Sequence, residues 1–187
     1  MRNLSERAEQ AKEKKAAIGP DVDLSTFTAE PVKHDYVKNL QTLPVIDQQR
    51  LIQAGIDTAE TGRAGTYIQM DTQVVHSHAS QEGLQVIPIK EALKKYDWAR
   101  EYYWKLVNVD ADKYTAAAEL NLHDGYVIRA LPGAKAIWPV QACLYLDKEG
   151  LQQNVHNIII AEEDSERPVL LQGWFPVHRR AESRAHV

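Results

Sequence analysis

Four apolar runs, each closed by a turn signal, fill residues 124–174 of the chain. The turn signals are Pro132-Gly133, the segment DKEG, an acidic run and a glycine. Short β-rich runs bounded by Gly, Pro and acidic turns predict successive strands. The four runs cover residues 126–131, 136–146, 154–161 and 168–172. This pattern predicts a strand-rich module, and by itself it indicates no function.

The residues before this module mix helical and strand patterns, which predicts an α+β region ahead of the strands. Good helix formers and an apolar spacing near 3.6 predict helices over residues 4–18, 47–56, 90–105 and 110–122. Asp47, and either Asp110 or Asp112, are expected to cap two of these helices. Residues 66–79 predict one long strand or two short ones, and residues 83–89 predict another. A connector (21–44) and a loop (57–65) separate the first elements.

Length and composition limit the classes of protein that this chain can represent. Its 187 residues and 44% hydrophobic content suit one domain, or one small domain plus part of a second. A net charge of −4 and a pI near 6.0 argue against a nucleic-acid binder, which usually carries a basic face. The sequence contains no run of 18 consecutive apolar residues, so it predicts no membrane span. The N-terminus lacks the apolar core of a secretory signal.

Cys143 is the single cysteine of the chain. It excludes an intrachain disulfide and indicates a reducing, cytoplasmic setting. It also excludes a cysteine-only metal cluster within one copy of the chain. Because Cys143 lies in an apolar run with no His or Lys among its close sequence neighbours, we expect a small buried hydrophobe and not a nucleophile.

The sharpest metal-like spacing is His76-x-His78 followed by Glu82. On a strand, residues i and i+2 point to one face, so the two histidines can share a cation. The HxHxxxE spacing resembles the first motif of the cupin family of metal-binding β-barrels. Met70 and Ile89 stand where that motif has glycines. The safer interpretation is two histidines on an exposed strand.

No other residues combine into a recognisable catalytic motif. His156 is expected to be a structural or surface residue, and His123 lacks the surroundings of a metal ligand. The GRAG segment at residues 62–65 lacks the lysine and helix start of a phosphate-binding loop. The aromatic residues of 96–104 are expected in a core or interface. The residues therefore predict no catalytic site and no metal ligand, and they leave any cofactor-binding residue unknown.

Three segments in order resemble the SufB/SufD family, the β-helix proteins of the SUF iron–sulfur cluster assembly system. The first is residues 67–93, in which strands lead through GLQVIPIKEAL into a helix. The second, residues 112–139, has a helix with a small-residue run, the turn Asp124-Gly125, and the elements Pro132-Gly133 and Pro139-x-Gln141. The third is HNIIIAEEDSERPVLLQG, residues 156–173. The resemblance covers roughly residues 66–187.

The resemblance implies an α+β N-terminal domain followed by the first coils of a right-handed parallel β-helix. We place the helical and mixed domain at residues 1–122 and the start of the β-helix at residues 123–187. Family members continue past the point matching Val187, and residues 179–187 carry no helix stop. The sequence therefore predicts a fragment that ends as another strand begins.

The family acts as a scaffold and not as a conventional enzyme. The resemblance implies pairing with a SufB/SufD-like subunit and binding of a SufC-like ABC-type ATPase, with a transient iron–sulfur cluster on the full complex. Many SufB-like sequences place a cysteine after the glycine that matches Gly173, where this chain has Trp174. This difference favours a SufD-like or divergent member with no cluster ligand in this segment.

Three hypotheses follow from the sequence. The first is the scaffold component, in the cytoplasm, without nucleic-acid or membrane partners. Its exposed β-helix end also predicts self-association. The second is a cupin-like metal enzyme that uses His76, His78 and Glu82. The third is a β-rich interaction domain with no catalytic role.

Overall fold

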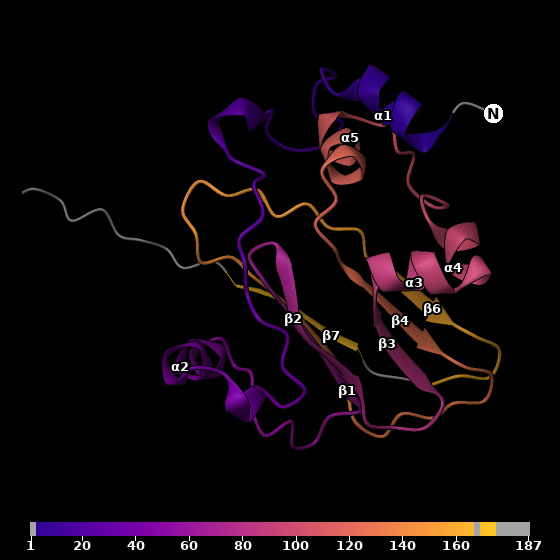
Figure 1. Ribbon diagram of the computed structural model, residues 1–187. Helices are drawn as coiled ribbons and strands as arrows, with labels where there is room; N and C mark the ends of the chain where they lie inside the picture. The colour runs from indigo at the N-terminus through magenta and orange to yellow at the C-terminus, as the bar shows by residue number, and fades with distance from the viewer. Residues whose placement is uncertain (1–2, 167–168, 175–187) are drawn as a thin grey trace, which may run out of the picture.

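The computed structural model of the protein describes residues 3–166 and 169–174, the latter by their backbone. These residues form two β-sheets surrounded by short helices (Figure 1). The helices are α1 (Leu4–Ala11), α2 (Val45–Gln53), α3 (Ile89–Lys95), α4 (Asp97–Tyr102) and α5 (Lys113–Leu120), with 3-10 turns η1 (Leu24–Thr26) and η2 (Leu40–Thr42). The strands are β1 (Gly65–Met70), β2 (Gln73–Ala79), β3 (Leu84–Pro88), β4 (Tyr126–Ala130), β5 (Val140–Tyr145), β6 (Ile158–Ala161) and β7 (Val169–Trp174). Along this part of the chain, no helix has the length and apolar character needed to cross a bilayer.

The strands of residues 126–174 enter the two sheets in alternation. β4 and β6 are parallel neighbours in a sheet of order β3-β4-β6, and β5 and β7 are parallel neighbours in a sheet of order β2-β1-β5-β7. Val127 pairs with Ile158 and Val140 with Val169, so the chain returns to the same sheet after about 30 residues, a spacing found in solenoid repeats. The prediction of four strands in this stretch is confirmed.

Strands from the first part of the chain extend both sheets. β1 and β2 form an antiparallel hairpin, so residues 66–79 are two strands, and β1 also lies parallel to β5. β3 pairs antiparallel with β4. Both sheets thus contain strands from each side of residue 122, and the division into domains 1–122 and 123–187 stays a prediction.

Apolar clusters cover both faces of β1, β4 and β5. The space between the sheets is filled by one apolar cluster, which includes Tyr67, Val86, Tyr126, Ile128 and Ala142. η2 and α2 cover the outer face of the four-stranded sheet with Leu40, Leu43 and Leu51. α3 and α4 cover the outer face of the other sheet with Ile89, Ala92 and Ala99 (Figure 1). Because β1 is enclosed on both faces, all six of its residues are buried and show no simple alternation.

At the turn Asp124-Gly125, the backbone comes close to the backbone of His156. Gly125 has φ +137°, and a Cβ built there would lie 2.1 Å from the carbonyl oxygen of His156. The N–H of His156 donates to the carbonyl oxygen of Asp124 at 3.1 Å. Only glycine permits this approach of two backbones without strain.

Two predicted helices are wrong in extent. The helix expected over residues 4–18 ends at Ala11. Ala8 and Ala11 are buried against Val109 and Ala116, whereas residues 12–15 are exposed and add no apolar packing to extend the helix. Beyond that point the carboxylate of Asp112 accepts the backbone N–H of Ala17 at 3.0 Å, which competes with helical bonding. The helix expected over residues 90–105 is two helices, because Tyr96 adopts an extended backbone between them.

Of the two helix caps expected from the sequence, one is confirmed and one is wrong. Asp112 caps α5 by accepting the backbone N–H groups of Tyr114 and Thr115, both at 2.9 Å. The cap position of α2 is Pro44, so Asp47 lies in the first helical turn and is not the cap. An acidic residue there still faces the positive end of the helix dipole.

Candidate functional site

The two histidines singled out by spacing lie on β2 and are brought together with a carboxylate. The ring of His76 is buried, with 1% of its side chain exposed, whereas 53% of the His78 side chain is exposed. One extra residue, Val75, interrupts the β1–β2 register beside His76. Such a bulge commonly re-aims side chains next to functional sites.

The third member of this group is Glu60 and not Glu82. Glu60 Oε1 lies 3.2 Å from His76 Nε2 and 3.9 Å from His78 Nδ1. One ligand atom from each of Glu60, His76 and His78 lies within 4.8 Å of the others. Glu82 is exposed and is not part of this group, so the HxHxxxE interpretation is wrong in its third residue.

Glu60 is presented by the polar loop between α2 and β1. Asp57 organises that loop, because its carboxylate accepts the backbone N–H of Ala59 at 2.9 Å and of Thr61 at 3.1 Å. Glu60 itself has φ +56°, an uncommon conformation for a residue other than glycine. Its backbone N–H donates to Asp57 O at 3.0 Å. The loop thus holds the Glu60 carboxylate over β2.

The ring of His76 is fixed on its other side. His76 Nδ1 lies 3.0 Å from the carbonyl oxygen of Val37. A carbonyl only accepts, so Nδ1 carries the proton, and Nε2 presents its lone pair toward Glu60 in the neutral ring. The N–H of Val37 also donates to Val75 O at 2.8 Å, which ties the connector to β2 on both sides of the ring.

A second polar centre lies at the turn between β1 and β2. Asp71 Oδ2 lies 2.9 Å from His34 Nε2, and Asp71 Oδ1 accepts the backbone N–H groups of Asp147 at 2.8 Å and Lys148 at 3.0 Å. The hydrogen bond to Asp71 raises the pKa of His34. Burial opposes ionisation of Asp71, but His34 and the two amides hold its pKa below the ordinary value. These contacts join three chain segments and serve the fold.

Cys143 behaves as the sequence predicts. It lies on β5 with none of its surface exposed, among apolar residues under α2. Burial raises the pKa of its thiol to about 12. A thiol with so little thiolate at neutral pH is neither a ready nucleophile nor a ready metal ligand.

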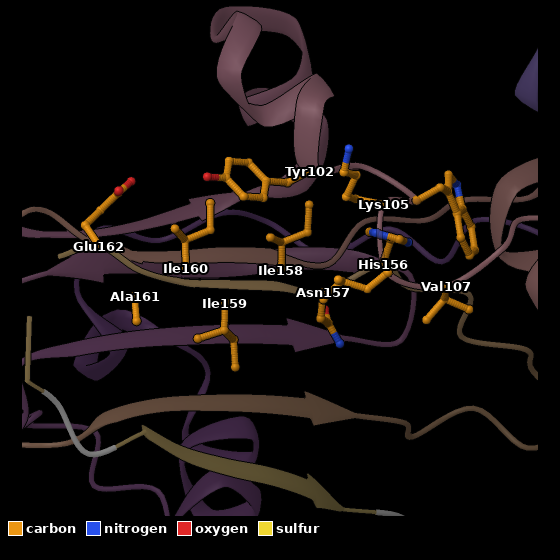
Figure 2. A pocket seen from close by; sticks show the side chains of 12 residues that line it. Tyr102, Lys105, Val107, His156, Asn157, Ile158, Ile159, Ile160, Ala161 and Glu162 are labelled. Carbon is orange, nitrogen blue, oxygen red and sulfur yellow. The ribbon is translucent and has the colours of Figure 1, made fainter.

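A cleft of about 420 Å³ lies between β6 and the segment that follows α4. Ile158 and Ile160 point toward Tyr102 across this cleft, and Ile159 points to the opposite face of β6 (Figure 2). His156 lies at one end, with its ring centroid 4.6 Å from that of Tyr103 and 4.4 Å from that of Trp104. Burial lowers the pKa of His156, which favours a neutral, structural ring.

The remaining aromatic residues of this region also pack as expected. Tyr96 and Trp98 stack with centroids 5.4 Å apart, and the guanidinium of Arg129 lies 4.2 Å from the Trp98 ring centroid. Glu119 accepts hydrogen bonds from the Tyr103 hydroxyl at 2.7 Å and from Trp104 Nε1 at 2.8 Å. Among the described residues, these rings stabilise the layer over β4 and β6.

His123 and Trp174 are the two remaining positions that the sequence analysis singled out. His123 bridges two chain segments, with Nε2 2.8 Å from Ala29 O and Nδ1 accepting the N–H of Asn154 at 3.0 Å. Trp174 pairs with Tyr145 through the backbone at the end of β7. The Trp174 side chain and residues 179–187, where another strand was expected to begin, lie outside the described residues.

Comparison with curated proteins finds relatives named for iron–sulfur cluster assembly. A SufBD family protein of Methanothermobacter thermautotrophicus (strain Delta H) is 39% identical over 175 residues, which cover 91% of this chain and 43% of the relative. A SufBD family protein of Archaeoglobus fulgidus is 44% identical over 125 residues, covering 67% of this chain and 34% of the relative. A scan against models of known protein families finds no match.

The chain spans less than half the length of these relatives. The match to the first relative nevertheless extends over nine-tenths of the chain, so it includes both sheets and is not confined to one motif. By this similarity the chain belongs to the SufB/SufD family.

Proposed function

We propose that the chain is part of a scaffold for iron–sulfur cluster assembly and that it acts without a catalytic site of its own. The observation that carries this proposal is the 39–44% identity to curated proteins that are named iron–sulfur cluster assembly SufBD family proteins. It operates in the cytoplasm, with a SufB/SufD-like subunit and a SufC-like ABC-type ATPase as partners. The cluster is cargo, formed transiently on the complete complex.

In this proposal, β4 to β7 begin a right-handed parallel β-helix. The alternation of strands between two sheets and the parallel pairing at about 30-residue intervals support it. β6 and β7 are the last strands of their sheets, and each has one edge without a strand partner among the described residues. Further coils or a partner subunit would satisfy these edges, because an unpaired edge otherwise invites aggregation.

The cupin-like enzyme has less support. The two described sheets do not close into a barrel, and Glu82 does not join His76 and His78. The third hypothesis, an interaction domain without catalysis, is compatible with the scaffold proposal. The scaffold proposal differs in naming the proteins that the chain binds.

Co-expression tests the proposed function. The full-length protein that contains this chain is produced with an ABC-type ATPase and a SufB/SufD-type subunit from the same genome. A stable complex after size-exclusion chromatography, identified by native mass spectrometry, is the expected result. Anaerobic supply of iron and sulfide should then produce the absorption of a labile cluster.

Failure of the three proteins to associate would overturn the proposal. A complex that forms with an unrelated ABC-type ATPase as readily as with the SufC-like ATPase would also count against it. The unrelated ATPase is therefore the matched control for specificity.

A further inference from the structure

We propose that Glu60, His76 and His78 form a binding site for a divalent transition-metal ion. Two imidazoles and one carboxylate are a ligand set that suits Zn²⁺ and Fe²⁺. The site lies on β2 and in the loop before β1. It is built from different elements than the unpaired edges of β6 and β7, and it does not depend on the proposed scaffold role.

The geometry around His76 Nε2 is the first argument. Nδ1 holds the ring proton because it faces the Val37 carbonyl, so in the neutral ring Nε2 and Glu60 Oε1 are two acceptors 3.2 Å apart. Such a pair requires a cation, which is either a second proton on the ring or a metal ion. A hydrogen bond from the distal ring nitrogen to a backbone carbonyl is the usual support of a metal-binding histidine.

The position of His78 favours the metal ion over the second proton. A proton shared by His76 and Glu60 needs no third group, yet His78 Nδ1 converges on the same Glu60 oxygen at 3.9 Å. In a tetrahedral zinc site with bonds of about 2.0–2.2 Å, ligand atoms lie about 3.3–3.5 Å apart. The His76–Glu60 distance is close to this range, and a movement of about half an ångström would bring the exposed His78 ring to the same distance from Glu60. The ligand atoms of all three residues lie within 4.8 Å of one another.

Burial is graded across the group in a way that suits metal entry. His76 is buried, Glu60 is half-buried and His78 is exposed. The inner ligand is therefore held by packing, and the outer one closes the site from the solvent side. Three protein ligands leave at least one position for water or another ligand, as in catalytic or transport sites and unlike closed structural sites.

The loop conformation adds independent support. Glu60 has a left-handed backbone, φ +56°, within a loop organised by Asp57. Non-glycine residues in such conformations cluster at functional sites, where the surrounding structure compensates for the strain. Here that strain places a carboxylate against two histidines that lie 16 or more residues away in sequence.

Metal titration tests this site. The protein, with purification tags removed and after treatment with a chelator, is titrated with Zn²⁺ by calorimetry, and with Fe²⁺ under anaerobic conditions. One ion per chain is expected, and Mg²⁺, which prefers oxygen ligands, should not compete. Co²⁺ should give the visible absorption bands of a low-symmetry site.

Three variants assign the ligands. His78→Ala and Glu60→Gln should each weaken Zn²⁺ binding by at least about 10–100-fold, since loss even of supporting groups has effects of that size. Glu82→Gln is the matched control, because it removes the carboxylate that spacing alone suggests, and it should bind like the unaltered protein. Circular dichroism of each variant verifies that the fold is retained.

Two results would overturn the proposal. One is the absence of stoichiometric binding by the unaltered protein, which would leave Glu60 and His76 as an ordinary ion pair. The other is unchanged Zn²⁺ affinity in both His78→Ala and Glu60→Gln, which would place the bound ion elsewhere. Either result leaves the co-expression test of the scaffold function unaffected.

Discussion

At the scale of single residues, spacing in the sequence identified some site members and missed others. His76 and His78 were expected to share a face because strand side chains alternate, and both lie within reach of one carboxylate oxygen. Glu60 could not be found in this way, since a loop of uncommon backbone conformation brings it from 16 residues before His76. The only signal for it is a polar loop with two glycines, which predicts a turn and no partner.

The pair His34–Asp71 should make the stability of the fold depend on pH. The raised pKa of His34 means that its contribution is complete below its unfolded pKa of about 6.5 and is lost as pH rises through the folded pKa. The lowered pKa of Asp71 means that its contribution is present above about pH 3.8 and is lost as pH falls through its folded pKa. The pair therefore stabilises most between these limits.

His34→Gln should lower the free energy of unfolding at pH 6 by about 1.5–3 kcal/mol, the usual value of a hydrogen bond to a charged group. The difference from the unaltered protein should shrink at pH 9. Urea denaturation at both pH values measures it. Lys33→Gln, at an exposed neighbouring residue, is the control. An equal loss at both pH values would show that His34 contributes only as a neutral side chain.

At the scale of elements, the sequence predicted strands better than helix ends. The strands of residues 124–174 carry their own turn signals, so their number and order are correct. The end of α1 depends on Asp112, about 100 residues away, which takes the N–H of Ala17. The break at Tyr96 likewise lets Ala92 and Ala99 pack into the same cluster, a tertiary contact that local propensity does not encode.

Gly125 provides a test of the close approach between its backbone and that of His156. Gly125→Ala should lower the free energy of unfolding by about 2–4 kcal/mol, because the new Cβ would collide with the backbone of His156. Gly133→Ala is the matched control, since Gly133 has φ +71° and open space around it, and should cost only about 1–2 kcal/mol. Thermal unfolding of both variants compares them. Equal losses would show that backbone conformation, and not the close approach, decides the effect.

At the scale of the whole molecule, the stacking of strands sets an order of local stability. β1 and β5 have strand neighbours on both sides and are covered on both faces, whereas β6 pairs only with β4 among the described residues. Regions with few buried contacts and exposed hydrogen bonds open first. β6 is therefore expected to open more readily than the enclosed strands β1 and β5.

Hydrogen–deuterium exchange measured by mass spectrometry should follow this order in the chain described here. Amides of β1 and β5 should exchange most slowly, and those of β6 severalfold to many-fold faster. Addition of a further strand or of a bound partner across the β6 edge should slow exchange in β6 with little change in β1. Equal protection of β6 and β5 without any addition would contradict the assignment of β6 as an open edge.

The corners between the two sheets also differ in length. Ala130 and Val140 bound the first corner and Ala161 and Val169 the second, which is thus two residues shorter, yet the parallel registers on both sides are maintained. The corners can therefore differ in length without a change in how the strands pair. The corner near Gly133, where an added side chain would meet open space, is accordingly a suitable place to attach a peptide epitope or a fluorescent label. A label there would report on the molecule without changing which side chains enter the core.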